Sequence, residues 1–131
     1  MSTPAGALPL EGLVDIVLRE LSPDLLTEAW REQRGEEAHP LTGYCYVVSE
    51  ALYYLLGGER SGWEVYRCRL QTGGTHWWLQ SPEGHVLDAT SAQFDSPLDY
   101  GNGRRTGFLS QTPSRRARLL IERVEHALKF E

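Results

Sequence analysis

Three residues that lie far apart in the chain carry the side chains that thiol catalysis requires: Cys45, His76 and Asp88. In such chemistry a thiolate attacks a carbonyl carbon, a histidine within hydrogen-bond reach takes up the thiol proton, and a carboxylate orients the histidine. Cys45 lies just inside the start of a predicted helix, where unpaired backbone N–H groups and the helix dipole favour a thiolate. We therefore predict that Cys45 is a nucleophile, that His76 is its base and that Asp88 orients the histidine.

The helix that positions Cys45 is predicted to run from Thr42 to the Gly57-Gly58 pair. Its apolar residues recur three and four positions apart, and they are Tyr44, Val47, Val48, Ala51, Leu52 and Leu55. This broad stripe predicts a central helix packed against a sheet. Cys45 lies about 100° around the helix from the middle of the stripe, so we expect its sulfur to be half-exposed at the rim of the core.

Three segments rich in aromatic and β-branched residues follow this helix and predict an antiparallel meander. They are residues 63–70, 75–80 and 85–90. Residues 91–112 are rich in Gly, Pro, Asn and Asp, so we expect mostly loop there, with a short helical turn near Ala92–Phe94.

The turn between the second and third predicted strands decides whether His76 and Asp88 share a face of the sheet. Residues 81–84 (SPEG) have Pro and Gly where a three-residue hairpin loop needs them, and this loop pairs Ser81 with His85. In that register His76 and Asp88 are diagonal neighbours on one face, about 7–8 Å apart, which their side chains can bridge. A two-residue loop would place Asp88 on the opposite face.

The Gly73-Gly74 pair predicts where the second cysteine lies. A two-residue turn at these glycines pairs Cys68 with Leu79, on the face opposite His76. We therefore expect Cys68 to be a buried structural residue, as free cysteines usually are.

Helices from both ends of the chain are expected to flank this core. Leu13, Ile16, Val17 and Leu21 mark a first helix, Ser22-Pro23-Asp24 starts a second one through Leu25, Leu26, Ala29 and Trp30, and a last helix starts at Thr112-Pro113. We read residues 1–9 as a loose leader and residues 10–131 as a single domain. The predicted fold class is α+β, with a central helix on a sheet of three to five antiparallel strands and with flanking N- and C-terminal helices.

The order Cys, His, Asp, with the cysteine opening a helix and the other two on consecutive antiparallel strands, resembles the papain-like and transglutaminase-like cysteine hydrolases. Residues 42–45 (TGYC), 74–77 (GTHW) and 88–94 (DATSAQF) are also similar to small bacterial and phage proteins of the YunG type. The resemblance covers residues 42–94, and the flanking helices add little to it. It implies a small papain-like core in which Cys45 attacks an amide or acyl carbonyl through a thioester intermediate.

The same resemblance implies an oxyanion hole formed by the Cys45 backbone N–H and one side chain. Papain-like enzymes often place a glutamine six residues before the cysteine, where this chain has His39. The candidate donors are therefore His39, Thr42 and Tyr44. This departure leaves peptidase, amidase, deamidase and acyltransferase chemistry open. Trp77 and Trp78 point to opposite sides of their strand, so we expect one in the core and one beside the substrate.

Composition sets limits on location and partners. Two cysteines are too few for a disulfide scaffold and no secretory leader opens the chain, which favours a reducing, cytoplasmic location. No apolar run approaches the roughly 20 residues of a membrane span. The expected substrate is a protein, a peptide or a small amide, without a cofactor or a metal, and the oligomeric state is left open.

Two alternatives compete with catalysis. Cys45, His76 and Asp88 are also zinc-ligand types, although no CxxC or HxxxH pair supports a metal site. The other alternative is a binding or regulatory module that uses a basic face at the C-terminal end, together with the loop at Tyr100–Arg105. Residues 65–131 carry 9 basic and 7 acidic side chains, and the basic face would comprise Arg104, Arg105, Arg115, Arg116, Arg118, Arg123 and Lys129. Such charges are usually the solvated side of a helix, so we expect no nucleic-acid binding.

Overall fold

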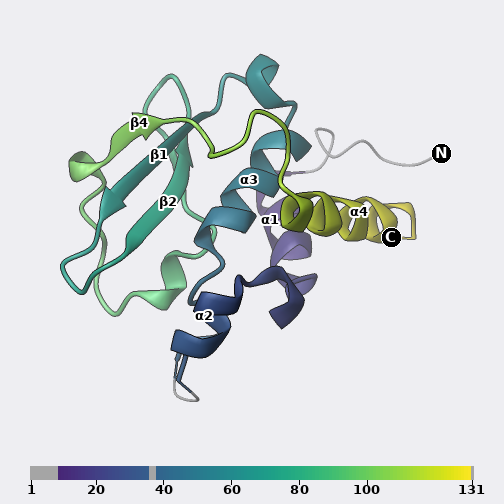
Figure 1. Ribbon diagram of the computed structural model, residues 1–131. Helices are drawn as coiled ribbons and strands as arrows, with labels where there is room; N and C mark the ends of the chain where they lie inside the picture. Colours follow the sequence, from purple (N-terminus) through teal and green to yellow (C-terminus); the bar gives the residue numbers. More distant parts are fainter. Residues whose placement is uncertain (1–8, 36–37, 131) are drawn as a thin grey trace.

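The computed structural model describes residues 9–35 and 38–130, so most of the predicted leader lies outside it. This part of the chain forms the helices α1 (Leu10–Arg19), α2 (Glu28–Gln33), α3 (Cys45–Leu55) and α4 (Arg115–Lys129). Its strands are β1 (Glu64–Arg69), β2 (Thr75–Gln80), β3 (Val86–Leu87) and β4 (Arg104–Thr106), which form one antiparallel sheet in the order β3-β2-β1-β4 (Figure 1). The predicted α+β class is therefore confirmed.

The central helix α3 lies between the sheet and the terminal helices α1 and α4 (Figure 1). Its residues Val48, Ala51 and Leu52 are at most 1% exposed, and they share one core with apolar residues from both sides. The α4 residues in this core are Ala117, Leu120, Val124 and Leu128, spaced three and four apart as an amphipathic helix requires. None of the helices in residues 9–35 and 38–130 is long and apolar enough to cross a bilayer.

The second helix predicted from Ser22 onward is not continuous. Pro23–Leu25 form a single 3-10 turn, and the extended backbone of Leu26 ends it. A new helix, α2, then starts because the Thr27 hydroxyl accepts a hydrogen bond from the Trp30 N–H at 3.2 Å and caps its first turn.

The turn between β2 and β3 has the predicted three-residue loop. The Ser81 N–H donates to the His85 carbonyl at 2.9 Å, and Gly84 adopts a φ of +88°. Leu79 therefore pairs with Leu87, as the predicted register requires. The strand itself is shorter than predicted, because β3 ends at Leu87, one residue before Asp88.

The turn between β1 and β2 was predicted wrongly. Gly73 and Gly74 do not form the centre of a two-residue turn. The Leu70 N–H donates to the Gly74 carbonyl at 3.0 Å and the Leu70 carbonyl accepts from the Gly73 N–H at 3.0 Å, which closes a three-residue loop that ends at Gly73. Cys68 consequently pairs with His76 and lies on the same face of the sheet. It is still buried, at 9% exposure.

The region between β3 and α4 contains one strand that the sequence did not predict. β4 pairs with β1 at the edge of the sheet, and its Arg104 and Arg105 are exposed. A short, charged edge strand lacks the apolar alternation on which prediction depends. The predicted short helical turn is present as a 3-10 turn at Ser91–Gln93. The last helix begins at Arg115, slightly later than the predicted start at Thr112-Pro113.

Candidate functional site

Cys45 is the first residue of α3, at the end of the helix that meets the start of β2. Its Sγ donates to the carbonyl of Thr75 across 3.8 Å. Within the described part of the chain no side chain caps this end of α3, so its first backbone N–H groups have no side-chain partner there. Such N–H groups stabilise negative charge on a thiolate or on an oxyanion. The residue is only 8% exposed, which is more buried than the half-exposed position expected from the sequence, because it belongs to the main core.

His76 and Asp88 form a direct, buried pair on the face predicted for them. The distance from His76 Nε2 to Asp88 Oδ2 is 2.7 Å, and the two side chains are 1% and 3% exposed. Because Nε2 is held by the carboxylate, Nδ1 is the ring nitrogen left to exchange a proton with sulfur. The Cys45 side chain is close enough to this ring to raise the pKa of His76. His76 and Asp88 are thus joined as predicted, and the placement of Cys45 near them is consistent with the predicted order of sulfur, imidazole and carboxylate.

The surroundings of His76 favour its protonated form. Burial alone lowers its pKa, but the hydrogen bond that it donates to Asp88, the negative charge of Asp88 and the neighbouring Cys45 side chain raise it to about 9. An imidazolium at neutral pH stabilises a neighbouring thiolate, which is the ion pair on which cysteine hydrolases depend.

Tyr100 completes the chain of hydrogen bonds and was missed by the sequence analysis. Its hydroxyl donates to Asp88 Oδ2 at 2.8 Å, so this oxygen accepts from both the tyrosine and the histidine. Burial and this bond to the carboxylate raise the pKa of the Tyr100 hydroxyl. Asp88 Oδ1 is buried and accepts no hydrogen bond from the residues that the structure describes. Tyr100 lies in the segment expected to be loop. A tyrosine among turn-forming residues was all that the sequence offered to mark this position.

Aromatic rings enclose the His76–Asp88 pair. Phe94 meets the His76 ring edge-on, with ring centres 4.7 Å apart, and Trp78 stacks on the same ring at 5.8 Å. Trp78 in turn packs against Tyr100. These rings keep water away from the pair and so strengthen its hydrogen bond.

Trp77 and Trp78, of which one was expected in the core and the other beside the substrate, are both buried. Trp78 is fully buried on the His76 side of β2. Trp77 is 7% exposed and belongs to the main core, where its ring meets Tyr46 edge-on at 4.7 Å. A contact between either ring and a substrate stays a prediction.

The three candidate oxyanion donors lie just before α3 in the chain. His39 is exposed, and its Nδ1 accepts from the Leu41 N–H at 3.1 Å. Thr42 is half-buried, and Tyr44 is 4% exposed with the Arg34 guanidinium 5.4 Å from its ring centre. No hydrogen bond joins these three side chains to the triad within residues 9–35 and 38–130, so their role stays a prediction.

The same described residues contain no group of three or more His, Cys, Asp or Glu side chains arranged to hold a metal ion. Comparisons of the chain with protein-family models, with curated proteins and with solved structures found no match.

The raised pKa of His76 predicts how stability depends on pH. The folded state binds the His76 proton more tightly than the unfolded state, whose pKa is the ordinary 6.5. Protonated His76 therefore contributes about 3 kcal/mol to the free energy of unfolding. This contribution is fully present below pH 6.5 and is lost as the pH rises through about 9. Urea unfolding of the wild type and of His76→Gln near pH 6 and near pH 10 measures it. The stability difference between the two proteins should shrink at the higher pH, and an unchanged difference would contradict the prediction.

Proposed function

We propose that this protein is a thiol-dependent hydrolase or acyltransferase of the papain-like or transglutaminase-like kind, in which Cys45, His76 and Asp88 act as a catalytic triad. The observation that carries the proposal is the buried 2.7 Å bond between His76 and Asp88, with Cys45 beside the same ring at a helix N-terminus. The proposed substrate is an amide or acyl group of a peptide, a protein or a small molecule. A reducing compartment fits the two free cysteines.

In the proposed reaction His76 Nδ1 takes the proton from Cys45, and the sulfur attacks the carbonyl carbon of the substrate. The resulting oxyanion is stabilised by the Cys45 N–H at the uncapped start of α3. His76 then gives its proton to the leaving group, and a thioester remains on Cys45. Water or an amine attacks this thioester, the S–C bond breaks and the thiol regains its proton. Asp88 holds the ring orientation throughout.

The burial of Cys45 favours certain acyl donors over others. With 8% of the residue exposed, the sulfur is open to a small or flexible group more readily than to a rigid loop of a folded protein. A flexible peptide end or a side-chain amide therefore fits the site best.

The alternative of a binding module with a basic face is less well supported. Arg123 donates to Ser22 and pairs with Asp24, and Arg105 pairs with Glu64 at 3.1 Å. Arg116 Nε donates to the Leu26 carbonyl. Three of the seven residues of the predicted basic face thus have partners within the chain. Fewer of its positive charges are therefore available to a binding partner than the sequence suggested.

Alkylation by iodoacetamide tests the proposal without knowledge of the substrate. Cys45 is expected to react near pH 7 about tenfold faster than Cys68, because His76 supports a thiolate at Cys45. Burial, followed by neighbouring negative charges, raises the pKa of the Cys68 thiol. Mass spectrometry of the two cysteine peptides over time measures both rates.

His76→Gln should slow the alkylation of Cys45 by about tenfold, because the glutamine cannot hold the thiol proton. His126→Ala, on the exposed side of α4, is the matched control and should leave the rate unchanged. A Cys45 rate that is equal to that of Cys68, or that is insensitive to His76→Gln, would show that the thiol is not activated and would favour the binding module.

A further inference from the structure

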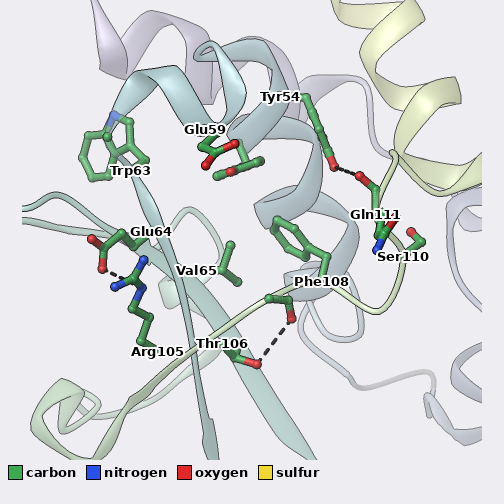
Figure 2. Close-up of a pocket in the computed structure, with 13 residues that line it drawn as sticks. Tyr54, Glu59, Trp63, Glu64, Val65, Arg105, Thr106, Phe108, Ser110 and Gln111 are labelled. Atoms are coloured by element: carbon green, nitrogen blue, oxygen red, sulfur yellow. Dashed lines mark hydrogen bonds and ion pairs between the residues drawn. The ribbon is translucent and has the colours of Figure 1, made fainter.

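A hollow lies away from the triad, between the end of α3 and the edge of the sheet. It measures about 410 Å³, within the usual range of small-ligand sites. Its walls come from the last turn of α3, the 3-10 turn at Gly58–Ser61, the start of β1 and the segment from β4 to Gln111 (Figure 2). Tyr54 follows Cys45 by nine helical positions, so the hollow lies about 14 Å along α3 from the sulfur.

Aromatic side chains form much of this wall. Tyr53, Tyr54, Trp63 and Phe108 all line the hollow, and each is half-buried. The Tyr53 ring stands at 87° to that of Tyr54 and at 67° to that of Phe108. Rings at such angles present π surfaces in several directions, as a site for an organic cation does.

The charges around the hollow are predominantly negative. Glu59 and Glu64 are acidic lining residues, and Arg105 is the basic one. Arg105 is held by Glu64 at 3.1 Å, which leaves the Glu59 carboxylate without a salt-bridge partner in the described chain. Figure 2 shows this carboxylate between Trp63 and Tyr54.

The α3 helix adds to the negative potential in the hollow, through its backbone and through one of its side chains. The hollow lies at the C-terminal end of α3, where the carbonyl end of the helix dipole favours positive charge. The buried carboxylate of Glu50 lies one turn before Tyr54 on the same helix. Burial first, and then the charge of Glu50, raise the pKa of the Tyr54 hydroxyl.

We propose that this hollow binds an organic cation of the ammonium type, with the aromatic rings of Tyr54, Trp63 and Phe108 around it and Glu59 as its counter-ion. A methylated ammonium group matches both the apolar rings and the single unpaired carboxylate. The group comes either from a small amine or from a modified lysine of a peptide, and both share this chemistry. The site is independent of the triad and of the proposed catalysis.

The test is a titration of the ¹⁵N-labelled protein with tetramethylammonium chloride at constant ionic strength. The backbone N–H signals of Gly62 and Gly107 and the indole N–H of Trp63 are expected to shift and to saturate. Uncharged tert-butanol, of similar size, should produce no saturable shift at these positions. Glu59→Gln should weaken tetramethylammonium binding about fivefold, as loss of one exposed counter-ion does. The matched control, Glu125→Gln on α4, should not weaken it.

Some outcomes of this titration would contradict the proposed cation site, and others would identify the source of the cation. Equal shifts with tert-butanol, absence of saturation, or an unchanged affinity in Glu59→Gln would overturn the proposal. Tighter binding of an acetylated trimethyllysine amide than of choline would support a peptide source, and the reverse order would support a small amine. The titration repeated on Cys45→Ser should give the same result, so failure of the proposed catalysis leaves this test intact.

Discussion

Cys45→Ser is expected to hydrolyse p-nitrophenyl acetate no faster than buffer, a loss of about 10⁴-fold or more from the wild type. This activated ester reports acyl transfer to sulfur without requiring the natural substrate. In the proposed mechanism the His76–Asp88 pair, joined at 2.7 Å, activates Cys45 to form an acetyl thioester. A serine hydroxyl at the same place is far less acidic and is not ionised by this histidine. Stopped-flow absorbance measures the burst, and intact-mass spectrometry measures the acetyl group on Cys45.

The control for this prediction is Cys68→Ser, which should keep the burst. Cys68 pairs with His76 across the sheet and shares its face, so it is the second thiol near the proposed base. Burial nevertheless raises its pKa, which disfavours the thiolate that the chemistry needs. A burst that survives in Cys45→Ser and disappears in Cys68→Ser would move the nucleophile to Cys68 and contradict the proposed triad.

Glu50→Gln is expected to lower the free energy of unfolding by about 3 kcal/mol, with a fall in Tm of roughly 10 °C. Glu50 is fully buried on α3, and its two oxygens accept from the Ser114 N–H and Oγ–H at 2.7 Å each. The same serine caps α4, because its Oγ accepts from the Ala117 N–H. An amide keeps the size of the side chain, but it sets an N–H donor against one of these donors. Urea unfolding and differential scanning calorimetry measure the loss.

Two further variants test whether the loss of the Glu50–Ser114 hydrogen bonds causes this fall in stability. Glu125→Gln is the matched control, and because this side chain is exposed it should change stability by less than about 0.5 kcal/mol. Ser114→Ala combined with Glu50→Gln should cost less than the sum of the single changes, because the two side chains share hydrogen bonds. Additive losses, or a loss in Glu50→Gln no larger than in the control, would show that the Glu50–Ser114 contact does not join α3 to α4.

The central elements could be predicted because local chemistry determines them. The apolar stripe of α3 specifies a helix, and Cys45 at its start follows from the same pattern. The Pro82 and Gly84 positions specify the three-residue loop, which alone decides that His76 and Asp88 share a face. The orientation of these two side chains was therefore predictable before any tertiary contact was known.

The features that were missed depend on tertiary context. Two adjacent glycines are compatible with several turn types, so the side of the sheet on which Cys68 lies depended on whether Leu70 pairs with Gly74. β4 forms because β1 offers a free edge, and the sequence of Arg104–Thr106 does not show this. Tyr100 and Glu50 find their partners 12 and 64 positions away along the chain, beyond the range of any local pattern.

The small exposed surface of Cys45 also bears on how long the thiol lasts. A reactive thiolate in solvent is oxidised to a sulfenic acid and then to irreversible sulfur acids. Here 8% of the residue meets solvent, and the nearest hydrogen-bond partner of the sulfur is a backbone carbonyl. An exposed surface this small slows large oxidants more than small ones, so we expect hydrogen peroxide to oxidise the sulfur faster than a bulky disulfide does.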